Sequence, residues 1–356
     1  MKLANRFMRS ATWEGMAAED GSVTPKLTKT MVDLAKGGVG LIISGHAYVL
    51  PEGQAGPWQM GIYKDELIDG LKIMVNEVHE AGGKIVAQLA HSGAFARKEI
   101  IKQVPHVVSN FEGLSKSPRH ELTKKDIQKL IKAFAEAAQR AKIAGFDGVQ
   151  LHAAHGYLLS QFLSPAYNRR NDEYGGPIEN RVRIHLEMYH AIQDVVGADY
   201  PVLIKINSED FLDNGLNLND SITASTMLFD AGIDAIELSG GTLYSGKLSP
   251  SRLGINKEEK EAYFKEAAAL FKKEINVPLI LVGGVRSLNV AEQILENGIA
   301  DYISMCRPLI REPGLINRWK SGDTHPARCK SDNLCLEPAW EGKGIYCVVE
   351  EKEKSK

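Results

Sequence analysis

Short apolar runs recur along the chain, and each is followed by a longer segment in which apolar residues repeat at helical spacing. Most of the runs lack alternation of apolar and polar residues, which is typical of parallel strands that are buried on both faces. Strands are expected at residues 6–10, 39–44, 84–89, 148–152, 202–206, 235–239, 278–282 and 301–305. Helices are expected at residues 25–36, 65–81, 123–144, 179–196, 218–231, 257–274, 287–297 and 313–320.

Eight strand–helix alternations predict an α/β protein. The expected architecture is a closed (β/α)8 TIM barrel with elaborated loops after strands 3 and 4. The loops in question are residues 91–122 and 153–178. A doubly wound open sheet is the structural alternative. We expect two domains: the barrel at residues 1–322, and a cysteine-containing extension at residues 323–356 that ends in a charged, frayed tail from Val348 to Lys356.

Composition and charge narrow the class of protein. The chain has 356 residues, 44% of them hydrophobic and 25% charged, with a net charge of −2. These values are typical of an ordinary globular protein and give no general attraction to nucleic acid or to an anionic membrane. The longest apolar runs are too short for a transmembrane helix. Four cysteines are too few for a disulfide scaffold, so we expect a cytoplasmic protein. A homo-oligomer is also expected.

The most informative motif lies at the end of the fourth predicted strand. It begins with His152 and His155, and Tyr157 follows two residues later. Two imidazole N–H groups can hold one carbonyl oxygen while a phenol supplies a proton. With a hydride source, this set would reduce a C=C bond conjugated to a carbonyl group. The alternatives are a metal site, although the zincin spacing and its glutamate are absent, or two structural core histidines.

Two further polar residues lie at the ends of other predicted strands. Gln88 can both donate and accept hydrogen bonds, which suits the pyrimidine edge of a flavin. Lys205 lies within an apolar strand, where a cation would stabilise negative charge on a reduced flavin. A polar residue at the barrel rim is the alternative for Gln88, and an ion pair with Glu237 or Glu209 is the alternative for Lys205.

A phosphate site is indicated after strands 7 and 8. Gly283 and Gly284 follow strand 7, and Cys306 and Arg307 follow strand 8 at the start of a helix. Glycines allow close approach of the backbone, and a guanidinium binds phosphate. A glycine turn and a surface arginine are the alternative. The chain has no Walker loop and no dinucleotide-type glycine motif, which favours a mononucleotide such as FMN.

These motifs together resemble the old yellow enzyme family of NADH:flavin oxidoreductases, and most closely the barrel domain of 2,4-dienoyl-CoA reductases. The resemblance rests on the segment from His152 to Pro165 and on its continuation, Asn168 to Gly176 and Glu179 to Arg183. It implies an FMN that is bound non-covalently, reduced by NADH or NADPH, and reoxidised by a small enone-like acceptor.

The resemblance also implies a role for each site residue. His152 and His155 would hold the carbonyl oxygen of the acceptor, and Tyr157 would donate the proton. The remaining residues would contact FMN: Gln88 and Lys205 at its ring, Gly283, Gly284, Cys306 and Arg307 around its phosphate, and Ala11, Thr12 and Trp13 beside it.

The chain departs from the family pattern at three places. Trp13 aligns where many relatives have Thr or Cys near flavin N5, and His46 aligns where many have Gly or Ala. Long relatives carry a four-cysteine [4Fe–4S] motif, of which Cys329, Cys335 and Cys347 remain here. A structural or vestigial role is expected for these three thiols, with an iron–sulfur cluster or zinc as alternatives.

The sequence therefore predicts an enzyme, an FMN-dependent ene-reductase that takes electrons from NADH or NADPH. Hydride would pass from flavin N5 to the β-carbon of an α,β-unsaturated carbonyl compound, and Tyr157 would protonate the α-carbon. Three alternatives remain: a non-catalytic flavin carrier, an electron-transfer subunit of a larger complex, and another FMN-dependent barrel oxidoreductase.

Overall fold

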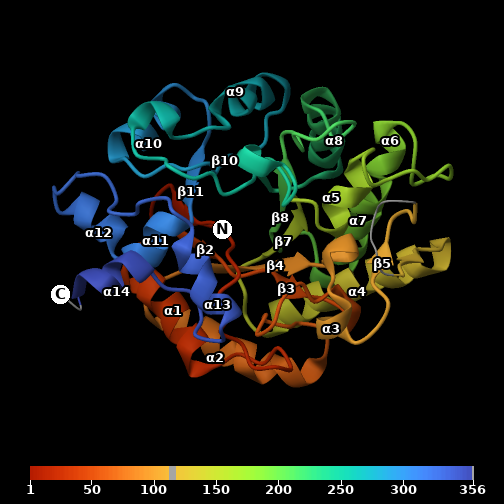
Figure 1. The fold of residues 1–356 in the computed structure, drawn as a ribbon, viewed down its shortest axis with the longest axis horizontal. Helices are drawn as coiled ribbons and strands as arrows, with labels where there is room; N and C mark the ends of the chain where they lie inside the picture. Colours follow the sequence, from red (N-terminus) through yellow and green to blue (C-terminus); the bar gives the residue numbers. More distant parts are fainter. Residues whose placement is uncertain (112–117, 355–356) are drawn as a thin grey trace.

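The computed structural model describes residues 1–111 and 118–354, which contain a closed barrel of parallel strands surrounded by helices (Figure 1). The barrel strands are β1 (Phe7–Arg9), β2 (Leu41–Ile43), β4 (Ile85–Ala90), β7 (Val149–Ala153), β8 (Val202–Asn207), β9 (Ala235–Ser239), β10 (Leu279–Leu281) and β11 (Tyr302–Met305). The ring closes because β2 pairs with β4 as well as with β1. The predicted TIM barrel and all of its strands are confirmed.

Each barrel strand is followed by a helix on the outside of the barrel. These helices are α1 (Pro25–Lys36), α2 (Ile68–Glu80), α4 (Lys124–Ile143), α7 (Arg183–Val196), α8 (Leu218–Ala231), α9 (Lys265–Glu274), α10 (Leu288–Glu296) and α12 (Leu315–Lys320). The Thr123 side chain accepts a hydrogen bond from the N–H of Asp126, and the side chain of Asp126 accepts one from the N–H of Thr123, which completes a capping box at the start of α4. The start signal in the sequence thus predicts where this helix begins.

One predicted helix is shorter than expected. The pattern predicts a helix over residues 257–274, but α9 begins at Lys265. The preceding residues form a 3-10 turn at Glu258–Lys260, and Ala262 has a φ of 50°. A non-glycine residue in the left-handed region interrupts a right-handed helix, so the helical spacing of residues 257–264 is not realised.

Short elements that the sequence did not predict decorate the loops. They are β3 (Ala47–Tyr48), β5 (His106–Val107), β6 (His120–Glu121), α3 (Lys98–Ile101), α5 (Leu158–Leu163), α11 (Arg307–Arg311) and α13 (Glu337–Trp340). The helix predicted at residues 179–196 is instead divided at Val182 into α6 (Ile178–Arg181) and α7. β5 and β6 pair with each other within the long loop after β4, and residues 112–117 of that loop lie outside the described residues. α5 lies in the long loop after β7, so both elaborated loops carry structure of their own.

The predicted frayed tail is wrong for most of its length. Residues Val348–Lys354 form helix α14, and residues 355 and 356 lie outside the described part of the chain. The guanidinium of Arg311 contacts Glu353 at 2.5 Å, which ties α14 to α11. Within the described residues, no helix has both the length and the apolar character that crossing a membrane requires.

Two layers of side chains fill the interior of the barrel. The lower layer is an apolar cluster, comprising Met8, Leu41, Ile43, Val86, Leu203, Ala235 and Ile280. Side chains of a strand point the same way at every second residue, so Gln88, Lys205 and Glu237 point inward two positions after Val86, Leu203 and Ala235. Because all the strands are parallel, this polar layer lies nearer their C-terminal ends, which is the face of a TIM barrel that carries active sites.

Candidate active site

A cavity of about 400 Å³ opens at the C-terminal ends of the barrel strands. Its size is within the range of small-molecule and cofactor sites. The cavity brings together every predicted site residue except Gly283, namely Ala11, Thr12, Trp13, Gln88, His152, His155, Tyr157, Lys205, Gly284, Cys306 and Arg307. Residues that are more than 280 positions apart in the chain therefore line the same cavity.

His152 lies near the end of β7 and His155 follows the strand, and both line the cavity. Their rings are nearly perpendicular, with centroids 5.2 Å apart. His155 has a φ of 65°, a conformation that is uncommon for a non-glycine residue and is held here by a hydrogen bond from its N–H to Asn207 Oδ1. His155 Nε2 lies 2.8 Å from Ser239 Oγ. This backbone turn directs the second imidazole into the same cavity as the first.

Burial keeps both imidazoles neutral. It lowers the pKa of His152 and that of His155 well below the usual value of 6.5, and the neighbouring positive charge of Lys205 lowers both further. A neutral imidazole carries one N–H and one acceptor nitrogen. His152 Nδ1 is buried and has no hydrogen-bonding partner among the described residues. A buried polar atom without a protein partner at a cavity wall is free to bond to a ligand.

Tyr157 and His46 lie beside the histidine pair. The ring centroid of Tyr157 is 4.9 Å from that of His152 and 5.4 Å from that of His46. Burial raises the pKa of the phenol to about 12, so it remains protonated. His46 Nδ1 lies 2.5 Å from Gln59 Nε2, and burial lowers its pKa to about 4. We call the four residues His46, His152, His155 and Tyr157 the histidine wall.

A hydrogen-bonded polar layer adjoins the histidine wall, since Lys205 is opposite His152 in the strand register. Lys205 Nζ lies 2.7 Å from Ser10 Oγ and 3.1 Å from Glu237 Oε1. Gln88 Nε2 donates to Gln150 Oε1 at 2.7 Å, and Gln150 Nε2 donates to Glu237 Oε2 at 3.0 Å. We call these five residues the polar floor. The sequence left two interpretations of Lys205 open, and the structure shows that it does form an ion pair, with Glu237.

Arg307 and Gly284 form the far end of the cavity. Gly284 has a φ of 77°, and a Cβ atom there would lie 2.7 Å from the ring of Tyr263, so glycine is required. Arg307 Nη1 donates to Arg252 O and to Asn333 Oδ1, both at 2.8 Å. Gly283 is adjacent but does not line the cavity. A guanidinium beside a glycine turn is suited to an anionic group such as phosphate.

The first strand continues into the cavity wall as Ala11, Thr12 and Trp13. Thr12 Oγ1 lies 2.9 Å from Cys306 Sγ, which joins the ends of β1 and β11. The Trp13 ring packs on Trp340 of α13, with centroids 4.5 Å apart. Ser331, Asn333 and Leu336 also line the cavity. The segment after residue 322 therefore packs on the barrel and contributes to the site.

The thiols of this C-terminal segment are free. Burial raises the pKa of Cys335 to about 12 and that of Cys329 above its usual value, so both favour the neutral thiol. Cys329 Sγ accepts a hydrogen bond from the N–H of Ser331 at 3.4 Å. The structural role that the sequence predicts for Cys329, Cys335 and Cys347, and its metal-binding alternatives, stay predictions.

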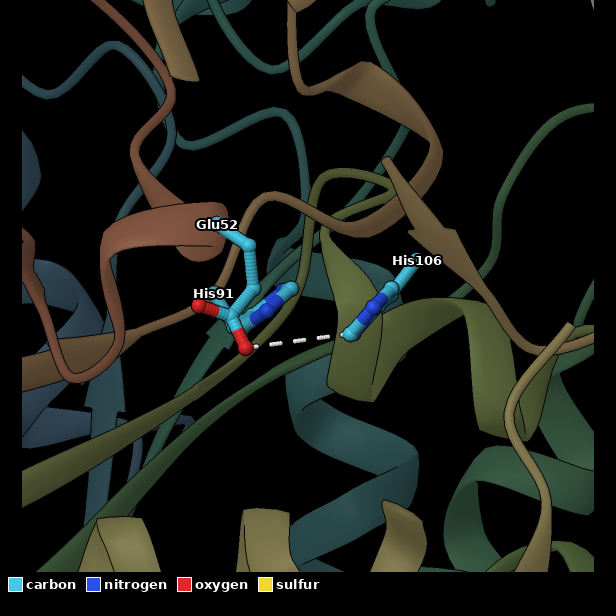
Figure 2. A group of neighbouring side chains, drawn as sticks. All are labelled: Glu52, His91 and His106. Carbon is cyan, nitrogen blue, oxygen red and sulfur yellow. Dashed lines mark ion pairs between the residues drawn. The ribbon is translucent and has the colours of Figure 1, made fainter. Parts of the chain in front are cut away.

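A second group of potential metal ligands joins the loop after β4 to the 3-10 turn Pro51–Gly53. Figure 2 shows Glu52, His91 and His106 converging, with ligand atoms that all lie within 4.8 Å of one another. However, His91 Nδ1 accepts a hydrogen bond from the N–H of Gly93 at 3.1 Å. Burial lowers the pKa of His91 to about 3, so the ring is neutral and its single proton is on Nε2. Neither nitrogen of His91 then offers a free lone pair, so this ring does not serve as a metal ligand in the arrangement shown.

Sequence reasoning missed several residues of the site. Gln150 was not singled out, and Tyr263, Asn333 and Arg286 were not considered as parts of the wall. Gln150 carried a usable signal, because a glutamine within the apolar run of a strand that is buried on both faces requires polar partners. Asn333 and Tyr263 carried none, since they reach the cavity from loops whose course the residue pattern does not determine.

Comparisons with known proteins agree with this geometry. Residues 1–325 match the model of the NADH:flavin oxidoreductase / NADH oxidase family. NADPH dehydrogenase of Clostridium acetobutylicum is 37% identical over 281 residues, which are 79% of this chain and 80% of that protein. NADH oxidase of Thermoanaerobacter brockii is 36% identical over 339 residues, which are 93% of this chain but 51% of that protein. This chain thus spans about half the length of the latter relative.

A solved structure of similar fold extends the comparison. The complex of 2-naphthoyl-CoA reductase with 2-naphthoyl-CoA superposes with a TM-score of 0.89 at 27% sequence identity. The match covers 98% of this chain and 55% of that one. The similarity in fold therefore extends over the barrel and most of the C-terminal segment.

Proposed function

The chain belongs to the NADH:flavin oxidoreductase / NADH oxidase family, the old yellow enzyme family, and we propose that it is an FMN-dependent ene-reductase. In this proposal NADH or NADPH is the electron donor, and an α,β-unsaturated carbonyl compound is the acceptor. The named relatives, an NADH oxidase and an NADPH dehydrogenase, support a nicotinamide donor. The solved relative is a reductase in complex with an acyl-CoA compound, which supports an acceptor that carries a carbonyl group.

The observation that carries the proposal is the pairing of two neutral imidazoles with a protonated phenol in one cavity wall. His152 Nδ1 has no protein partner within the described residues, and the hydroxyl of Tyr157 forms no hydrogen bond there either. Unlike the unpartnered Nδ1 of His185 in α7, these groups line the cavity, where a ligand can reach them. The unused polar atoms are consistent with a ligand that completes the hydrogen bonding.

The donors around the cavity fit FMN. The polar floor offers a cation and an amide to the pyrimidine part of the ring, and Arg307 and Gly284 offer an anion site to the phosphate. Gln88 Nε2 already donates to Gln150, so Gln88 Oε1 and its second N–H remain for alternating donors and acceptors on a ring edge. Ala11, Thr12 and Trp13 would run beside the ring. Bound FMN would supply the hydride that reduces the acceptor.

The histidine wall would act on the acceptor itself. His152 and His155 would direct their hydrogen bonds at the carbonyl oxygen, and so place the C=C bond over the site that delivers hydride. Negative charge develops on this oxygen in the transition state, and donors that are already in place there stabilise it without reorganisation. Burial keeps both imidazoles neutral. They would therefore hold the oxygen by hydrogen bonds from uncharged N–H groups.

Tyr157 would supply the proton that completes the reduction. Its pKa of about 12 keeps the phenol protonated at neutral pH, as a general acid requires. Its ring lies 4.9 Å from that of His152, which supports a hydroxyl position near an acceptor held by the imidazole pair. The α-carbon would take this proton while the β-carbon takes the hydride, and the product is a saturated carbonyl compound.

Steady-state turnover under anaerobic conditions tests the proposal. The protein, loaded with FMN, is mixed with NADH or NADPH and 2-cyclohexenone, with no other protein present. We expect oxidation of the nicotinamide to depend on the enone and to match the amount of cyclohexanone formed. Reduction of the flavin without any consumption of enone would instead indicate a flavin carrier or an electron-transfer subunit.

A further inference from the structure

The polar floor contains a carboxylate that does not touch the cavity. Glu237 lies in the middle of β9 with an exposed fraction of 0%, and neither it nor Gln150 lines the cavity. By contrast, Gln88 and Lys205, to which they are bonded, do line it. The strand register places these residues as neighbours, since Lys205 is opposite Glu237 and Gln88 is opposite Gln150. Gln88 and Lys205 thus face the cavity, and Gln150 and Glu237 are the buried residues that support them.

Both oxygens of Glu237 are engaged. Oε1 accepts from Ser10 Oγ at 2.7 Å and from Lys205 Nζ at 3.1 Å, and Oε2 accepts from Gln150 Nε2 at 3.0 Å. Burial alone would raise the pKa of this carboxyl group. The charge of Lys205 and the hydrogen bonds from Ser10 and Gln150 outweigh burial and hold the pKa below its usual value. Glu237 is therefore an ionised group that can only accept hydrogen bonds.

An acceptor-only group determines the orientation of the amides next to it. Gln150 must present its NH2 group to Glu237, so its Oε1 faces Gln88. Gln88 must then present its own NH2 group to Gln150, which leaves its Oε1 for a ligand. The same carboxylate holds the ammonium of Lys205 by an ion pair at 3.1 Å and balances its charge. One buried carboxylate thereby fixes the two side chains that face a bound ring.

We propose that Glu237 is a positioning residue, which with Gln150 sets the orientation of Gln88 and Lys205 and so tunes the reduction potential of bound FMN. This inference rests on the proposed function. A buried ion pair contributes little to stability compared with apolar residues of the same volume, so stability alone does not account for a charged network in the barrel. Its physical effect would be to balance the charge of Lys205 next to a ring that becomes more negative on reduction.

The variant Glu237→Gln tests the inference, because it removes the charge and keeps the size. The ammonium of Lys205 is then unbalanced and favours reduced flavin over oxidised flavin. We expect the ratio of the affinities for reduced and oxidised FMN to rise by at least tenfold. For a two-electron couple, this change corresponds to a midpoint potential about 30 mV more positive. The potential is measured by anaerobic titration against a redox dye of known potential.

A matched control uses a carboxylate that does not contact Lys205. Glu209 follows β8, and its carbonyl oxygen accepts from the N–H of Gly241. Glu209→Gln removes the same charge outside the polar floor, and its midpoint potential should equal that of the wild type. A Glu237→Gln protein that retains FMN at the wild-type potential would overturn the inference, even if its thermal stability is lower.

A second pair of variants keeps the inference testable if Glu237→Gln does not fold. Lys205→Met leaves the carboxylate unbalanced near the ring, whereas the double variant Lys205→Met/Glu237→Gln removes both charges. The double variant should have the more positive potential of the two, and equal potentials would overturn the inference. Wild-type protein that binds no FMN would contradict the proposed function itself, a result that is distinct from an unchanged potential in protein that binds FMN.

Discussion

The polar floor and the histidine wall are neighbouring groups of side chains, and their polar atoms form hydrogen bonds in different ways. On the floor, charged and amide groups bond to one another, as in the Lys205–Glu237 pair at 3.1 Å. On the wall, the imidazoles are neutral, and His152 Nδ1 has no partner among the described residues. The difference indicates that the floor is built to hold one permanent group in a fixed place. Under the proposed function, the wall would bind and release the ligand that changes during turnover.

Loss of His152 or His155 should have the largest effect, and it should slow the reaction of reduced flavin with the acceptor. His152→Ala or His155→Ala removes a hydrogen bond that strengthens in the transition state. The loss should slow enone reduction by ~10²–10³, about 3–4 kcal/mol. Stopped-flow absorbance separates flavin reduction by NADPH from flavin reoxidation by enone. Reoxidation at the wild-type rate in both variants would refute the role of the pair.

The neutral imidazoles of the wall should also make the protein sensitive to acid. Burial lowers the pKa of His46 from 6.5 to about 4, and it lowers those of His152 and His155 well below 6.5. The unfolded chain therefore binds more protons than the folded chain in this interval. The free energy of unfolding should decrease as the pH falls from about 6.5 towards about 4, by roughly 3 kcal/mol from His46 alone.

Denaturant unfolding at a series of pH values measures this dependence. The variant His46→Gln cannot titrate at this position, so its free energy of unfolding should fall less steeply over the same interval. Above pH 6.5 the two curves should run parallel, because the imidazole is then neutral in both the folded and the unfolded states. Equal slopes below pH 6.5 would mean that His46 is not a buried neutral imidazole in solution.

Replacement of Tyr157 by Phe should remove the proton donor and leave the floor intact. Flavin reduction by the nicotinamide should be nearly unchanged, whereas enone reduction should slow by roughly 10². A nitroalkene acceptor should be affected least, because its reduced anion is stable enough to be protonated by water. Parallel assays with 2-cyclohexenone and a nitroalkene check this. Wild-type rates with both acceptors would make Tyr157 a packing residue.

The smallest effect is expected at the phosphate end of the cavity. Arg307→Ala removes one charge-assisted contact, which is worth about 1.5–3 kcal/mol, so FMN should bind roughly tenfold to a hundredfold more weakly. Arg311 is the matched control, because it lies on the same helix but pairs with Glu353 and does not line the cavity. Fluorescence titration of the apoprotein gives both dissociation constants. Equal weakening in the two variants would argue against a phosphate site at Arg307.

Much of the fold could be predicted from the sequence, because parallel strands that are buried on both faces appear as short apolar runs between amphipathic helices. The candidate site followed from this, since polar residues at the ends of such strands must meet at one face. The partner of Lys205 could not be chosen between Glu237 and Glu209, because the choice depends on strand register. Residues such as Asn333 and Trp340 could not be placed, because loops direct them and loop paths depend on tertiary packing.

A single turnover tests the central claim most directly. Protein with FMN reduced by one equivalent of NADPH is mixed with 2-cyclohexenone in D2O, without oxygen and without any other protein. We predict that the absorbance of oxidised flavin returns as one equivalent of cyclohexanone forms, with deuterium from the solvent at the α-carbon. Flavin that stays reduced in the presence of the enone, while it reoxidises readily once oxygen is admitted, would contradict the account.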